Sequence, residues 1–239
     1  MSAVILSSIL SDLVLKNVSL IPVLNRFGIP LGLGNATVAE VCETYHIDQQ
    51  FFLCVTNSFL DPSYNGVLTL SKEHVHLTLE YLERANLYYT QAQIPNIRIH
   101  ITSFLKRSEP APGIADNVMA ILSDLEVAVR RFADKDESEL FPMIRKLWDT
   151  ESLRIDDWSL RFDDVETDEA FEAALGIVED LMQILIRYIK GHFDRNLLHG
   201  VIFALSSFRN DLESNIRLRT RVFLPIMAAL RQEADSIDK

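Results

Sequence analysis

The sequence predicts an all-α protein with a small N-terminal helical domain, residues 1–62, and an up-down four-helix bundle, residues 63–239. Apolar residues recur at helical spacing along most of the chain. The turn-forming run Asp-Pro-Ser-Tyr-Asn-Gly at residues 61–66 marks the boundary between the two domains. A layout at residues 132–144 recurs at residues 215–227, and paired helices of this kind line the centre of a bundle.

The two copies of this layout are in register. Each has two positions four residues apart, which share one face of a helix, followed by an apolar pair and a proline. A constant offset of 83 residues relates Phe132, Asp136 and Pro142 to Asn215, Arg219 and Pro225. The repeat therefore predicts two equivalent helices.

The composition is that of a folded chain that does not bind polyanions. Its 239 residues are 48% apolar, enough for one sizeable core or for a core plus a small domain. The net charge of −11 opposes contact with nucleic acid. The two cysteines form no CxxC pattern, and the apolar run before Asp12 is neither a signal peptide nor a membrane span. We expect a cytoplasmic protein that contacts no membrane.

Short helices are expected in the N-terminal domain. Gly28 ends the second of them, and Thr37 caps a helix that runs through Tyr45, with Glu40 completing a capping box. The neighbouring glycines are interpreted as turn residues, because no Gly-Lys-Ser/Thr follows them to bind phosphate.

Longer helices are expected after residue 71. Their ranges are Ser71–Gln91, Asp116–Trp148 with an interruption or kink at Pro142, Phe171–Ile189 and Leu197–Leu230. The first has an apolar stripe of Val75, Leu79, Leu82 and Leu87. Asp156–Glu172 carries eight acidic residues and one arginine. We interpret this stretch as a solvated connection, and the alternative is an acidic interaction surface.

The chain resembles the iron-sulfur cluster repair di-iron proteins, the RIC or ScdA-type family, whose bundle is a hemerythrin-like domain. Phe27-Gly28-Ile29 and Thr37 to Cys42 are similar to the small N-terminal domain of that family. Gly32 and Leu33 stand where the family has a Cys-Cys pair, so the thiol chemistry of that domain is not expected here.

The resemblance implies a bundle centre from which the iron ligands are missing. In the family, each repeated helix carries His-x-x-x-Glu before Leu-Phe-Pro, and further histidines lie on the other helices. The equivalent positions here are Asn86 or Leu87, Phe132, Asp136, Phe171, Asn215 and Arg219. We therefore expect no metal and no cofactor, with aromatic packing in the centre. The same alignment places Asp136 and Arg219 within salt-bridge reach and ends the first bundle helix at a turn at Ile94-Pro95.

No other metal site is predicted. Glu73-x-x-His76-x-x-x-Glu80 has the Glu-x-x-His spacing of carboxylate-bridged di-iron bundles, but those bundles need the motif on two helices. Residual metal binding at Glu73, His76 and Glu80 stays open. Cys42 and Cys54 are spaced as apolar helix residues, and we expect both to be buried and unreactive.

The hypothesis that fits these substitutions is a metal-free sensory or protein-interaction module, in one form the signal-receiving part of a transcriptional regulator. It predicts a protein partner or an output domain, and it leaves a homodimer open. The alternative is a di-iron protein of iron-sulfur cluster repair, or of redox or nitrosative stress, with altered ligands. A third reading is a small-molecule pocket inside the bundle. No Ser-His-Asp order, HExxH motif or dinucleotide fingerprint predicts another enzyme.

Overall fold

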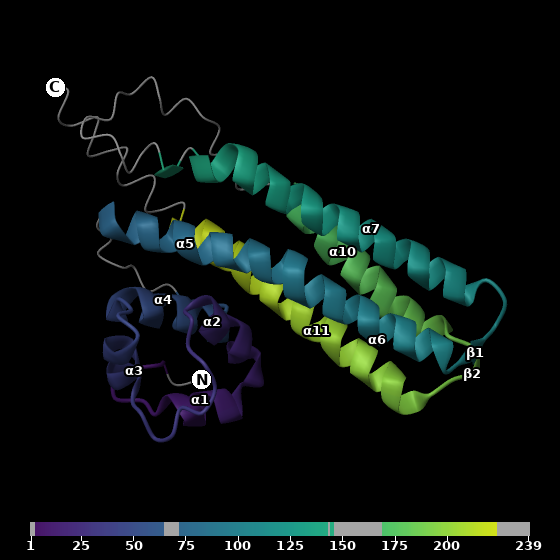
Figure 1. Cartoon of the computed structure of the whole chain (residues 1–239), viewed down its shortest axis with the longest axis horizontal. Helices are drawn as coiled ribbons and strands as arrows, with labels where there is room; N and C mark the ends of the chain where they lie inside the picture. The colour runs from purple at the N-terminus through teal and green to yellow at the C-terminus, as the bar shows by residue number, and fades with distance from the viewer. Residues whose placement is uncertain (1–2, 65–71, 143, 146–168, 224–239) are drawn as a thin grey trace. The chain divides into compact units, whose positions relative to one another are not determined.

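The computed structural model describes residues 3–64, 72–142, 144–145 and 169–223 (Figure 1). These residues are mostly helical, and strands are limited to two residues each, which confirms the prediction of an all-α chain. None of the described helices is both long and apolar enough to cross a membrane.

The chain divides into two compact units. The first comprises residues 1–84, 141–166 and 214–239, and the second comprises residues 85–140 and 167–213. Two of the boundaries fall inside the long helices α5 (Lys72–Tyr88) and α11 (Arg195–Leu218), so each of these helices contributes to both units. The division into domains 1–62 and 63–239 stays a prediction.

Short helices form the N-terminal part of the first unit. They are α1 (Leu10–Lys16), the 3-10 turn η1 (Val18–Leu20), α2 (Ile21–Arg26), α3 (Val38–Thr44) and α4 (Gln49–Leu60). The predicted capping box is confirmed, because the Glu40 N–H donates to Thr37 Oγ1 and the Thr37 N–H donates to Glu40 Oε2. Gly28 follows α2 with a φ of 71°, which supports its predicted role as a helix terminator.

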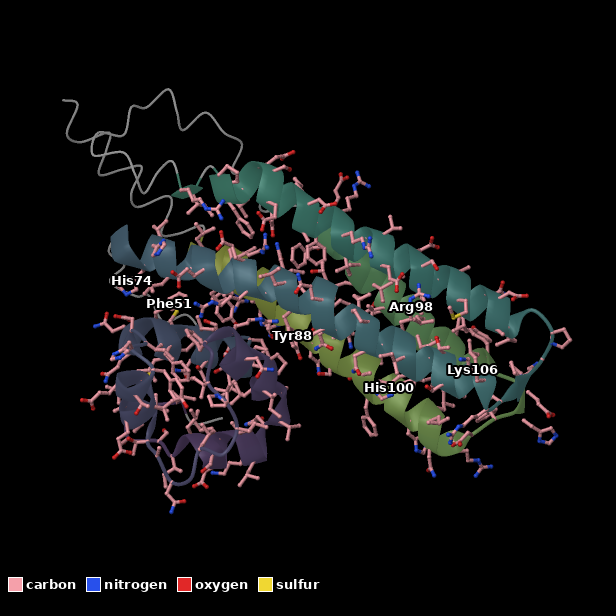
Figure 2. The ribbon with its side chains drawn as sticks, in the orientation of Figure 1. Phe51, His74, Tyr88, Arg98, His100 and Lys106 are labelled. Atoms are coloured by element: carbon pink, nitrogen blue, oxygen red, sulfur yellow. The ribbon has the colours of Figure 1, made fainter. Side chains whose placement is uncertain are left out.

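Polar and aromatic contacts hold the first unit together. The side-chain amide of Asn57 on α4 accepts a hydrogen bond from the Val4 N–H at 2.7 Å and donates one to the Val4 carbonyl at 3.1 Å. These two bonds attach the segment before α1 to α4. The rings of Phe27, Phe51, Phe52 and Tyr81 cluster with centroid separations from 5.0 to 6.3 Å. Phe51 is labelled in Figure 2.

Helices α6 (Ile94–Lys106), α7 (Ile114–Lys135), α10 (Glu169–Gln183) and α11 lie side by side in Figure 1. At one end of these helices β1 (Glu109–Pro110) pairs antiparallel with β2 (Gly191–His192). Arg98 on α6, labelled in Figure 2, forms a two-bond ion pair with Glu126 on α7 at 2.6 and 2.5 Å. This pair and the β1–β2 ladder connect segments that are distant in the sequence.

The face of α7 that packs against α10 follows from its sequence. Its buried residues are spaced by three or four positions and include Val118, Leu122, Leu125, Val129 and Phe132. On α10 the buried residues include Phe171, Ala174, Val178 and Leu181 at the same kind of spacing. Part of the core of the second unit lies between these stripes.

The long helices contain π-helical turns. These turns are η2 (Tyr89–Gln93), η3 (Asp136–Leu140), η5 (Ile184–Tyr188) and η6 (Arg219–Phe223). The turns η3 and η6 keep the 83-residue offset of the sequence repeat, so the repeated layout has a repeated backbone conformation.

Proline accounts for the position of most of these turns. Pro95, Pro142 and Pro225 each come two residues after the end of a π turn. A proline has no N–H, and its ring crowds the carbonyl four residues back, whereas a π turn bonds five residues back and relieves the crowding. The expected end of the helix at Ile94-Pro95 is therefore wrong, because α6 begins at Ile94 and continues through Pro95. The predicted interruption at Pro142 takes the form of η3.

Candidate functional site

An aromatic cluster fills the core of the second unit at two of the predicted ligand-equivalent positions. Phe132 on α7 and Phe171 on α10 are buried and stack with 3.9 Å between ring centroids and 21° between ring planes. Tyr89, at the start of η2, presents its ring nearly perpendicular to Phe132 at 6.0 Å and to Phe208 of α11 at 5.6 Å. The structure thus brings Phe132 and Phe171 together, as the expectation of aromatic packing requires.

A buried polar pair occupies two more of these positions. Asn86 lies on α5, one turn before Tyr89, and Asp136 lies one turn after Phe132 at the start of η3. The Asn86 amide Nδ2 donates to Asp136 Oδ2 at 2.7 Å, and both side chains are almost fully buried. The Asn86 Oδ1 atom is buried without a hydrogen-bond partner. An amide donor therefore satisfies one oxygen of a buried carboxylate.

The other repeated helix carries its own buried pair, in the first unit. Arg219 Nε, at the start of η6, donates to Asn215 Oδ1 on α11 at 2.9 Å. Both residues are buried, at 3% and 2% exposure. The i, i+4 spacing predicted from sequence thus places both side chains on one helix face. Asp136 and Arg219 belong to different units, and their salt bridge stays a prediction.

The alignment left Asn86 and Leu87 as alternatives, and the structure distinguishes them by burial. Asn86 is 4% exposed, whereas Leu87 is 51% exposed. The predicted apolar stripe was therefore wrong at Leu87, since the next inward position after Leu82 at helical spacing is Asn86. Tyr89 continues the same stripe three residues later. Tyr89 and Phe208 are the residues of this cluster that the sequence interpretation missed, and the same helical spacing could have identified Tyr89.

The side chains at these positions do not fit a di-iron centre of the kind found in the resembling family. Iron in such bundles is held by inward carboxylates and imidazoles. At the ligand-equivalent positions, the second unit offers one carboxylate, Asp136, next to an amide and two phenyl rings, and the first unit offers an amide and the guanidinium of Arg219. Among the described residues there is no cluster of three or more His, Cys, Asp or Glu that could bind a metal ion.

The histidines of α5 point to different environments. His74 (Figure 2) is buried and lies 3.7 Å from Asp48, while His76 is exposed and lies 3.1 Å from Glu80. Glu80 is also 3.6 Å from Arg84. His76 and Glu80 thus belong to a surface charge network on one helix, and the side chain of Glu73 lies outside the described part of the chain.

The two cysteines are buried in the first unit, as predicted. Cys42 on α3 and Cys54 on α4 are each 1% exposed. Burial raises the pKa of each thiol to about 11, and the Asp48 charge contributes to the shift at Cys42. The thiolate, which is the reactive form, is therefore strongly disfavoured at neutral pH. Gly32 and Leu33 supply no thiol in the preceding turn.

The acidic stretch Asp156–Glu172 lies mostly outside the described residues, which resume at Glu169 in α10. Its interpretation as a connection or as an interaction surface stays a prediction.

Comparisons of the chain with models of protein families, with curated proteins and with solved structures found no match.

Proposed function

We propose that this chain is a metal-free, hemerythrin-like up-down four-helix bundle with a small N-terminal domain, which acts as a sensory or protein-interaction module. The observation that carries the proposal is the stacked pair Phe132–Phe171, because aromatic carbon occupies two positions where the resembling family places histidine ligands. A phenyl ring has no donor atom for iron, and buried rings of this size occupy space that a metal ion and its ligands would need.

The polar side chains support the same proposal. The Asn86 amide donates a hydrogen bond to Asp136, and the Asn215 amide oxygen accepts one from Arg219, so these side chains are partners of each other. A guanidinium keeps its positive charge in proteins and repels dications. A module of this kind acts through what its surface binds, in one form as the signal-receiving part of a transcriptional regulator.

Restoring the ligands tests the proposal. The restored variant carries Asn86→His, Phe132→His, Asp136→Glu, Phe171→His, Asn215→His and Arg219→Glu. We expect it to bind iron under anaerobic loading, while the natural chain binds none, because the proposal makes these six positions equivalent to the iron ligands of the resembling family. Substituting Leu87→His in place of Asn86→His is the matched control, since Leu87 faces solvent, and it should bind iron more weakly.

A folded restored variant that binds no iron would show that the positions are not ligand-equivalent. Iron bound by the natural chain would instead support the alternative, a di-iron repair or stress protein with altered ligands. Circular dichroism of each variant verifies that the helices remain formed.

A further inference from the structure

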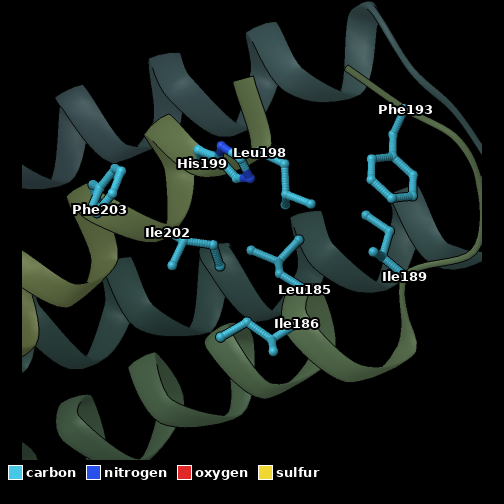
Figure 3. A pocket seen from close by; sticks show the side chains of 8 residues that line it. All are labelled: Leu185, Ile186, Ile189, Phe193, Leu198, His199, Ile202 and Phe203. Atoms are coloured by element: carbon cyan, nitrogen blue, oxygen red, sulfur yellow. The ribbon is translucent and has the colours of Figure 1, made fainter. Parts of the chain in front are cut away.

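An open apolar groove lies on the surface of the second unit. It runs between the end of the α10–η5 helix and the start of α11, and its volume is about 440 Å³ (Figure 3). The apolar side chains that line it include Leu185, Ile186, Ile189, Leu198, Ile202 and Phe203. These two segments are joined by β2, so the groove is built by one continuous stretch of chain.

Two of the lining side chains are strongly exposed. Phe203 is 74% and Ile186 is 63% exposed, although both are large and apolar. Single exposed apolar residues are common on protein surfaces, but exposed residues grouped around a hollow are typical of a binding site. Burying Phe203 and Ile186 against a partner would remove this apolar area from water.

The groove lies in a locally basic stretch of an acidic chain. Arg187, Lys190 and Arg195 are exposed, and none of them forms an ion pair within the part of the chain that the structure describes. Arg195 is one helical turn before Leu198 and His199, so it lies on the α11 face that lines the groove. Asp194, the acidic residue between Lys190 and Arg195, accepts hydrogen bonds from the backbone N–H groups of Asn196 and Leu197 and thereby caps α11.

We propose that this groove binds an acidic segment of a partner protein that carries bulky apolar side chains. The apolar side chains would enter between Ile186 and Phe203, and the acidic groups would face Arg187, Lys190 and Arg195. Helical segments are recognised in such grooves through apolar residues spaced by three or four positions. This inference rests on the proposed role as an interaction module and names the partner of that role.

The charges argue against the other candidate occupants. A symmetric dimer through this face would bring the same three cations of each copy together, and like charges at an interface oppose association. An anionic membrane is an extended surface, so it would also face acidic parts of this chain, whose net charge is −11. A short acidic peptide, in contrast, meets only the local field within roughly 8 Å at physiological ionic strength.

The test is fluorescence anisotropy with a short labelled helical peptide that has Leu, Trp and Phe at helical spacing and Glu at the other positions. We expect the natural chain to bind it and Phe203→Ser to weaken binding about tenfold or more, as for a central apolar contact. Combined Arg187→Glu, Lys190→Glu and Arg195→Glu should also weaken binding by at least about tenfold and flatten its salt dependence.

Matched controls come from α7, away from the groove residues in the sequence. Val127→Ser removes an apolar side chain of similar exposure, 66%, and Arg130→Glu with Arg131→Glu reverses exposed cations. Both controls should leave affinity within about twofold.

The proposal would be overturned by an absence of peptide binding, or by equal losses in groove and control variants. The proposal would also be overturned if the chain binds no peptide but associates with itself, or binds phosphatidylserine vesicles, in a way that Phe203→Ser abolishes. The iron content is measured separately, so a failed peptide test leaves the metal-free proposal standing.

Discussion

The ring of Phe171 lies on the ring of Phe132, with 3.9 Å between their centroids and 21° between their planes. The two residues come from helices α10 and α7, and both are buried. The resemblance predicts that these two positions are equivalent to metal ligands, and in the structure they are part of an apolar core. It also makes the stability of the second unit depend on aromatic packing.

Stacking predicts an energetic coupling between the two phenylalanines. Phe132→Leu and Phe171→Leu each remove a ring from a close-packed core, and the stack itself contributes about 0.5–1.5 kcal/mol beyond burial. The double variant should therefore lose less free energy of unfolding than the sum of the single losses, by about this amount. Urea denaturation measures the cycle. Phe104→Leu, which removes a buried ring from α6, combined with Phe132→Leu is the control and should be additive.

Replacing the amide that binds Asp136 should create a pH-dependent defect. Asn86→Asp places a second carboxyl beside Asp136, and repulsion raises the pKa of the new group above its unfolded value. The folded state then binds more protons, so the lost stability, about 2–3 kcal/mol at pH 7, should return as pH falls through this raised pKa. Asn86→Leu should also destabilise, but without the added pH dependence. Equal pH profiles of the two variants, measured by urea denaturation, would contradict the burial of the pair.

The β1–β2 ladder should require glycine at position 191. Gly191 has a φ of 109°, and a Cβ there would overlap the backbone oxygen of Glu109. Gly191→Ala should therefore destabilise the fold by more than about 1 kcal/mol. Gly176→Ala, within α10 and with open space around it, should instead stabilise by about 0.5–1 kcal/mol. Thermal melts of both variants measure the contrast, and two shifts in the same direction would refute it.

The buried cysteines should react slowly and should weaken the fold at alkaline pH. In the folded state each thiol keeps its proton up to a pKa of about 11, while the unfolded thiols ionise near their usual 9.0. The folded state thus binds more protons across this window, so the free energy of unfolding falls as pH rises from 9.0 to about 11. Cys42→Ala with Cys54→Ala should reduce this slope. Native labelling by a thiol reagent at the rate of a free peptide thiol would disprove the burial.

The sequence identified features that depend on local spacing. The Thr37–Glu40 capping box and the buried Val75, Leu79 and Leu82 of the predicted stripe follow from residues a turn apart, which one helix brings together whatever surrounds it. The 83-residue repeat likewise predicted equivalent backbones, which the π turns η3 and η6 share.

Other features depend on contacts between distant segments and were not predictable in this way. The hydrogen bond between Asn86 and Asp136 joins residues 50 positions apart, and the ring of Tyr89 meets Phe208 on another helix. The helix through Pro95 was missed because proline normally ends a helix, and the π turn that accommodates it has no simple sequence signature. The apolar groove was missed because apolar residues at helical spacing usually indicate core.

The iron content of the natural chain tests the central claim most directly. The protein is loaded anaerobically with ferrous iron, desalted and analysed for metal per chain by elemental analysis. Because Phe132 and Phe171 fill their positions and Asn86 and Asn215 bind Asp136 and Arg219, we predict that essentially no iron is retained. Retention of two tightly bound irons per chain would contradict the account.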